Sequence, residues 1–160
     1  MKKSLLLFVV LFSLMSCEED VSFNNPSLQG MKDNVFWRAV VSQATVASDG
    51  SLLIEGFTGN EVLTLRTTSI TYQVYPLGSS NSKTAVYEIN NGSGGEISFA
   101  TGIDIGSGQI VITAYDERDQ TISGTFKFSA ENTDGNQVEG SVLNFQQGVF
   151  YKVPVIFELP

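Results

Sequence analysis

Apolar and polar side chains alternate along most of the chain after residue 34, most clearly in residues 62–66, 110–115 and 125–130. A period of two, with many β-branched and aromatic residues, is typical of β-strands that bury one face. No window beyond the first 16 residues repeats apolar residues at helical spacing. The alternation predicts that Trp37, Leu63, Leu65, Ile110, Ile112, Phe126 and Phe128 are buried and that Thr64, Arg66, Thr125 and Lys127 are exposed.

Turn-forming residues separate these segments at strand-length intervals. Asp49-Gly50 and Gly59-Asn60 are dipeptides that supply the positive φ of tight hairpins. Further breaks are predicted at residues 76–81, 91–95, 106–108, 116–120, 132–136 and 146–148. The spacing predicts an all-β fold, an antiparallel β-sandwich or flattened barrel of about nine or ten short strands in sequential hairpins. A parallel α/β fold is excluded, because it requires crossover helices.

The first 17 residues have the layout of a bacterial secretory signal. Lys2 and Lys3 precede an apolar run at residues 5–14, and the segment ends at Cys17, the one cysteine of the chain. The run is too short to cross a bilayer, which takes about 20 apolar residues. Leu14-Met15-Ser16-Cys17 resembles a lipobox, which implies cleavage after residue 16 and acylation of Cys17. An ordinary signal would instead leave Cys17 as a lone thiol in an oxidising compartment.

Residues 17–34 are expected to form an acidic and polar tether to a single all-β domain at residues 35–160. Glu18, Glu19 and Asp20 follow the cysteine directly. A charge run of this kind is often only a solvated linker. Acidic residues in this position also resemble the surface-export signal of Bacteroidetes-type lipoproteins, which implies display on the outer membrane, anchored by lipid.

The composition of the chain argues against several classes of function. Residues 1–16 contain two of the nine basic residues and none of the seventeen acidic ones, so the 144 residues that remain carry seven basic and seventeen acidic side chains, a net charge of −10. An acidic chain without a basic cluster is a poor ligand for nucleic acid. The chain has no histidine, which removes the commonest general base and a common zinc ligand. We expect no enzyme activity and no cofactor.

Two oxygen-rich groups remain as weaker alternatives. Asp104, Asp116, Glu117 and Asp119 could supply a carboxylate pair for glycoside cleavage, although acidic residues are routine at turns. The segment 132–136 (NTDGN) resembles half of a calcium loop. It lacks a glutamate at the required spacing, since Glu139 comes too early, and the same residues suit a hairpin turn. No metal site is therefore predicted.

Aromatic side chains are the remaining candidates for ligand binding. Trp37 and five tyrosines (residues 72, 75, 87, 115 and 151) could form a carbohydrate platform. If Tyr72 and Ile112 face the core, the odd spacing along each strand places Tyr75 and Tyr115 on the solvent side. Tyr75 and Tyr115 are therefore the candidate binding aromatics.

Several short motifs carry a family resemblance, which covers roughly residues 35–155. They are VFWRA at residues 35–39, ITYQVYPLG at 70–78, TISGTFKFSAEN at 121–132 and VLNFQQGVFYKVPV at 142–155. The chain resembles an uncharacterised Bacteroidetes lipoprotein family of unknown function. The resemblance implies a small β domain behind a lipid anchor and no established chemistry.

Two functions are expected from these observations. The first is a non-catalytic binding module of the cell envelope, held to the membrane by its N-terminal lipid, whose partner is a glycan, a peptide or an outer-membrane complex. The second is a carrier of a small apolar ligand, which requires a barrel with a hollow interior. A filled interior would favour the module.

Overall fold

The computed structural model describes residues 27–90, 92, 96–135 and 140–158, and this part of the chain consists of eleven β-strands and their connections, with no helix. The prediction of an all-β fold is confirmed, with slightly more strands than expected. The strands are β1 (Ser27–Lys32), β2 (Val35–Arg38), β3 (Val41–Val46), β4 (Leu52–Phe57), β5 (Glu61–Thr67), β6 (Val74–Leu77), β7 (Thr84–Asn90), β8 (Glu96–Ala100), β9 (Ser107–Asp116), β10 (Thr121–Asn132) and β11 (Val142–Phe157).

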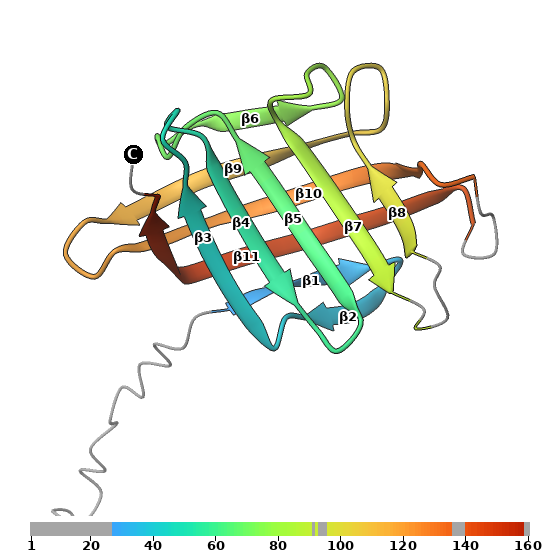
Figure 1. The fold of residues 1–160 in the computed structure, drawn as a ribbon, viewed down its shortest axis with the longest axis horizontal. Helices are drawn as coiled ribbons and strands as arrows, with labels where there is room; N and C mark the ends of the chain where they lie inside the picture. The colour runs from blue at the N-terminus through green and yellow to red at the C-terminus, as the bar shows by residue number, and fades with distance from the viewer. Residues whose placement is uncertain (1–26, 91, 93–95, 136–139, 159–160) are drawn as a thin grey trace, which may run out of the picture.

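The strands lie in two layers that cross each other (Figure 1). One layer contains β3, β4, β5, β7 and β8, joined in sequence by antiparallel pairing. The other contains β6, β9, β10, β11, β1 and β2. Strand β6 follows β5 in the chain, yet it pairs with β9 in the opposite layer. The predicted sequential hairpins hold for β1–β2, β3–β4–β5, β7–β8 and β9–β10–β11. Consecutive strands do not pair at the β2–β3, β5–β6, β6–β7 and β8–β9 connections.

Hydrogen bonds at both sides join the layers into a closed ring. Strand β10 pairs with β8 through Glu131 and Asn132. At the other side, residues 155–157 of β11 pair in parallel with residues 44–46 of β3. Because β10 also pairs with β11, the seven strands β3, β4, β5, β7, β8, β10 and β11 form a flattened barrel. Strands β1, β2, β6 and β9 extend the second layer beyond the ring.

Three predicted boundaries differ from the structure. Residues 27–32, assigned to the tether, form β1 instead; its inner face offers only Leu28 and Gly30, too little to show an apolar alternation. Pro76 was predicted to lie in a turn but belongs to β6, which pairs only with β9, and an edge strand tolerates the missing proline N–H. Residues 146–148 form a β-bulge within β11 rather than a turn, because β11 has one residue more than β10 between paired positions.

The space between the layers is filled by apolar side chains. In the part of the chain that the structure describes, twenty-five hydrophobic residues are buried, and all seven residues predicted to be core are among them. Arg66, Thr125 and Lys127 are exposed as predicted, and Thr64 is half-buried. Phe145 lies at the centre of an aromatic cluster, with ring centroids 5.6 Å from Trp37, 5.7 Å from Tyr87 and 5.2 Å from Phe128.

Glycines in the second layer are paired across strands with the aromatic residues of this core. The register pairs Gly30 with Trp37, Gly108 with Phe128, Gly124 with Phe150 and Gly148 with Phe126. A Cβ atom on Gly148 would lie 2.6 Å from the ring of Phe126. The aromatic rings therefore occupy the volume that side chains at the glycine positions would need.

Candidate functional site

The connection between β5 and β6 is held in place by a buried tyrosine. Tyr75 on β6 is 2% exposed. Its hydroxyl lies within hydrogen-bond distance of the hydroxyls of Ser69 (2.8 Å) and Thr71 (3.0 Å) and of their carbonyl oxygens (2.9 and 3.0 Å). The loop thus folds around a single phenolic group, which satisfies that group inside the protein.

The same loop displays Tyr72, which is 64% exposed. Its hydroxyl donates to the carbonyl oxygen of Tyr115 at 3.0 Å and accepts the amide of Tyr115 at 3.1 Å. Tyr115 lies next to the end of β9, beyond the residues that pair with β6. Two hydrogen bonds to one backbone unit fix the position of a ring that is largely open to solvent.

A surface hollow of about 330 Å³ lies beside this ring, lined by Ile70, Thr71, Tyr72, Tyr115 and Glu117. The lining combines an apolar side chain, two aromatic rings, a hydroxyl and a carboxylate. Ligand sites have this composition, in which a few polar groups orient a ligand on an apolar surface. We regard this tyrosine pocket as the candidate binding site.

The predicted roles of the tyrosines are partly wrong. Tyr75 was expected to face solvent and is buried, because it pairs with Ile110 and cross-strand pairs share a face. Tyr72 was expected to be buried and is exposed, because it lies in the loop before β6, where strand alternation does not apply. Tyr115 is half-buried, since an extra residue in β9 at Thr113 shifts the alternation that starts from Ile112.

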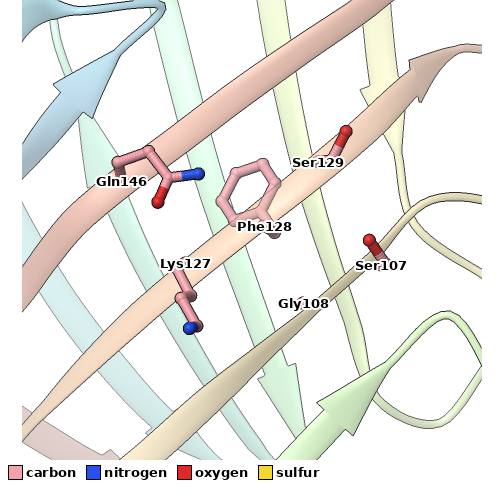
Figure 2. A pocket seen from close by; sticks show the side chains of 6 residues that line it. All are labelled: Ser107, Gly108, Lys127, Phe128, Ser129 and Gln146. Atoms are coloured by element: carbon pink, nitrogen blue, oxygen red, sulfur yellow. The ribbon is translucent and has the colours of Figure 1, made fainter.

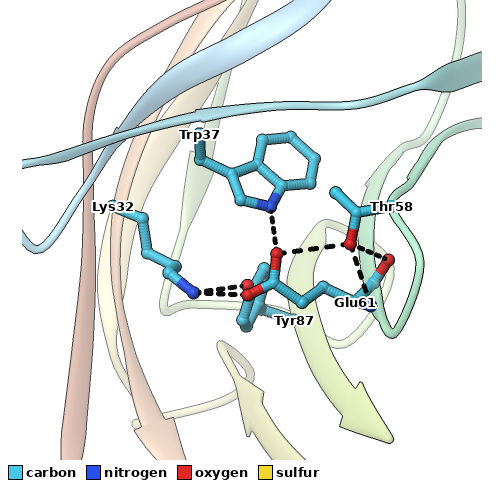
Figure 3. Close-up of polar contacts among 5 residues, drawn as sticks. All are labelled: Lys32, Trp37, Thr58, Glu61 and Tyr87. Atoms are coloured by element: carbon cyan, nitrogen blue, oxygen red, sulfur yellow. Dashed lines mark hydrogen bonds and ion pairs between the residues drawn. The ribbon is translucent and has the colours of Figure 1, made fainter.

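A second cluster of polar side chains joins the two layers (Figure 3). Glu61 on β5 receives a hydrogen bond from the Lys32 ammonium and one from the Trp37 indole, each 2.7 Å long. The same ammonium donates to the hydroxyl of Tyr87 at 2.7 Å, and the hydroxyl of Thr58 lies 3.3 Å from the Glu61 carboxylate. Lys32 and Trp37 belong to β1 and β2, so the cluster ties this hairpin to β5 and β7.

The electrostatics of this cluster are those of a structural ion pair. Partial burial alone would raise the pKa of Glu61, but hydrogen bonds from Lys32, Tyr87 and Trp37 and the charge of Lys32 outweigh it and lower the pKa. Burial, together with the neighbouring Glu61, raises the pKa of Tyr87. Because the folded pKa of Glu61 is depressed, its contribution to stability is present at neutral pH and is lost as the pH falls through that value.

The polar groups of the cluster are also paired with one another. In the described residues, every buried side-chain nitrogen or oxygen has a hydrogen-bond partner. A group that must exchange protons or bind substrate is more often strained or incompletely paired. We therefore interpret the Glu61 cluster as a clamp between layers.

Of the four carboxylates proposed for glycoside cleavage, Asp104 lies apart from the other three, which are at the β9–β10 turn. Asp104 lies between β8 and β9, and the whole of β9 separates it from the β9–β10 turn, which holds Glu117 and Asp119 (Figure 1). The carboxylate of Asp116 accepts the backbone N–H groups of Arg118 and Asp119 at 3.0 and 3.1 Å, so it stabilises its own turn.

Acidic residues are not confined to turns in this structure. Glu61 and Glu88 are on strands; burial and the charges of Glu96 and Asp134 raise the pKa of Glu88. Asp134 in the calcium-like segment accepts the N–H of Ser98, and its own N–H donates to Asn132 at 3.1 Å. Within the described residues, no group of three or more acidic or cysteine side chains is placed to hold a metal ion.

The N-terminal residues singled out in the sequence, Cys17, Glu18, Glu19 and Asp20, lie outside the described residues. Among the residues that are described, no helix is long and apolar enough to cross a bilayer.

Comparison with known proteins gives one match. The profile of a family described as "Domain of unknown function (DUF6252)" matches residues 24–154, which include β1 through most of β11. Neither a curated protein nor a solved structure matches the chain.

Proposed function

The chain belongs to this DUF6252 family of unknown function, and we propose that it is a non-catalytic glycan-binding module of the cell envelope. The observation that carries the proposal is the Tyr72 ring, which is largely exposed and yet fixed by two hydrogen bonds to Tyr115. A rigid aromatic ring provides contact area at a low entropic cost on binding.

The chemistry of the tyrosine pocket fits a sugar ring. The face of an aromatic ring is electron-rich, so it attracts the C–H groups on the apolar face of a pyranose. Thr71 and Glu117, which line the same hollow, can bond to sugar hydroxyl groups. The pocket thus offers both surfaces that a neutral glycan presents.

The packing of the interior supports a binding module rather than a carrier of apolar ligands. The flattened barrel closes, but 25 buried hydrophobic residues of its described strands and connections occupy the space between its layers. The tyrosine pocket lies outside this core. An apolar carrier would need an enclosed space of several hundred Å³.

Replacing Tyr72 by alanine is expected to weaken glycan binding at least tenfold, because it removes the stacking surface. The measurement uses the mature chain from residue 17 with Cys17→Ser, first on an array of neutral glycans and then by calorimetry on the best ligand. Tyr72→Phe keeps the ring but loses both hydrogen bonds to Tyr115, so its affinity should fall between those of the wild type and Tyr72→Ala.

Tyr151→Ala is the matched control, since Tyr151 is another exposed tyrosine (39%) outside the pocket. It should bind as the wild type does. A blank array, or equal losses for Tyr72→Ala and Tyr151→Ala, would remove the case for this pocket. Binding only to peptides would replace the glycan with another partner class.

We also propose that the module is a lipoprotein displayed on the outer membrane, on the strength of the charged and apolar leader, Cys17 and the acidic residues that follow it. In cells fed a labelled fatty acid, the wild type should carry the label and sediment with membranes. Cys17→Ser should lose the label and accumulate as an uncleaved or soluble form. An unlabelled wild type that still sediments with membranes would contradict acylation.

A further inference from the structure

The outer face of the second layer carries two neighbouring hollows of about 240 and 350 Å³. They lie over β9, β10 and β11, and Lys127 of β10 lines both. Figure 2 shows the smaller of the two. This surface is separate from the tyrosine pocket, which shares none of its lining residues. We call it the Lys127 face.

The lining of the Lys127 face contains one charge and it is positive. Its other side chains are hydroxyls, amides and apolar groups, with no carboxylate, although the chain has seventeen acidic residues. Lys127 is exposed, and among the described residues its ammonium has no ion-pair partner. The polar side chains of the two hollows are Ser107, Gln109, Thr125, Lys127, Ser129, Gln146 and Gln147.

The bulge in β11 brings two of these side chains to the same surface. Phe145 and Gly148 face the core, and Gln146 and Gln147 are both exposed between them. Gln147 adopts φ 52°, in the left-handed region that a side chain disfavours and glycine adopts freely. Bulges of this kind re-aim side chains and are frequent beside binding sites. In this protein the strained backbone at Gln147 places the side-chain amides of Gln146 and Gln147 in the two hollows that Lys127 lines.

We propose that the Lys127 face binds an acidic polysaccharide, a polyhydroxylated chain whose sugars bear carboxylate or sulfate groups. Neutral amides and hydroxyls make most of the contacts, so this ligand needs one cation rather than the basic cluster that a nucleic-acid backbone requires. The ammonium of Lys127 pairs with the anionic group. The glutamine amides and the serine and threonine hydroxyls bond to hydroxyl groups on either side of it. The residues from Thr125 to Ser129 span about 14 Å along β10, at roughly 3.4 Å per residue, so the ligand occupies more than one sugar unit.

The test is calorimetric titration of the mature chain carrying Cys17→Ser with three probes: polygalacturonate, dextran sulfate and uncharged dextran. We expect binding to one or both acidic polymers and none to dextran. Stronger binding of polygalacturonate would identify carboxylate as the preferred anionic group, and stronger binding of dextran sulfate would identify sulfate. Lys127→Gln should weaken binding at least tenfold, whereas Arg66→Gln, which removes an exposed cation from β5 in the other layer, should leave it unchanged.

Gln147→Gly separates a binding role from a structural one. It removes the left-handed strain, so the melting temperature should stay the same or rise, while binding to the acidic polymer should weaken severalfold. Three results would overturn the proposal. They are the absence of binding to either acidic polymer, wild-type binding by both Gln147→Gly and Lys127→Gln, and a loss of affinity in Arg66→Gln as large as that in Lys127→Gln. Tyr72→Ala should bind the acidic polymer normally, so failure here and failure of the tyrosine pocket are independent.

Discussion

Replacing Phe145 by alanine is expected to lower the free energy of unfolding by about 3–5 kcal/mol, the usual cost of emptying a large aromatic site. Phe145 is fully buried and its ring contacts those of Trp37, Tyr87, Phe126 and Phe128. These partners belong to both layers, so the cavity would open where the layers meet. Chemical denaturation followed by tryptophan fluorescence measures the loss, because Trp37 packs directly on Phe145.

Phe157→Ala provides the matched control. Phe157 is on the same strand but 44% exposed, so its replacement removes much less buried area and should cost well under half as much. If the two variants lost equal stability, the aromatic cluster around Phe145 would not be the centre of the core.

Replacing Gly124 by alanine is the second large effect we expect, a loss of about 2–3 kcal/mol from overpacking. A Cβ atom there would overlap the carbonyl oxygen of Val111 and the ring of Phe150. The oxygen belongs to the β9 backbone and cannot move without breaking its pairing with β10. Thermal unfolding measured by circular dichroism would report the loss.

Gly59→Ala tests whether this effect comes from packing. No atom lies within 4 Å of a Cβ built on Gly59. The positive φ predicted for the Gly59-Asn60 turn is wrong, because neither residue adopts a left-handed conformation. Alanine should therefore be neutral or slightly stabilising there, because it restricts the unfolded chain. A Gly124→Ala protein as stable as Gly59→Ala would show that the glycine–aromatic pairs are loosely packed.

The strands that obey simple alternation could be predicted from the sequence, and the irregular ones could not. Leu63, Leu65, Phe126 and Phe128 are buried as expected because their strands are regular where these residues lie. Strand β1 escaped prediction because glycine occupies one of its two fully buried positions. Its pairing with residues 145–151 of β11 is distant in the sequence and leaves no local signal.

The residues of the candidate sites were hard to predict because they lie in loops and at a bulge, where simple alternation fails. The sequence indicated the tyrosines as candidates, but the predicted surroundings of Tyr72 and Tyr75 are wrong, because Tyr72 lies in a loop and strand alternation does not extend to it. The sequence predicts a turn at residues 146–148 where the structure has a bulge, because glutamine and glycine are compatible with both. Only the pairing of β11 with β10 shows that the chain continues straight and that both glutamines are exposed beside Lys127.

The closure of the ring by residues 155–157 also determines the order in which this protein can fold. Strand β1 pairs with residues 145–151, and β3 pairs with residues 155–157. These contacts join the two ends of the domain, and such distant pairings slow folding because a long loop must close first. During synthesis β1 and β3 can pair with β2 and β4, but each keeps one unpaired edge, which needs protection from other chains, until β11 has been made.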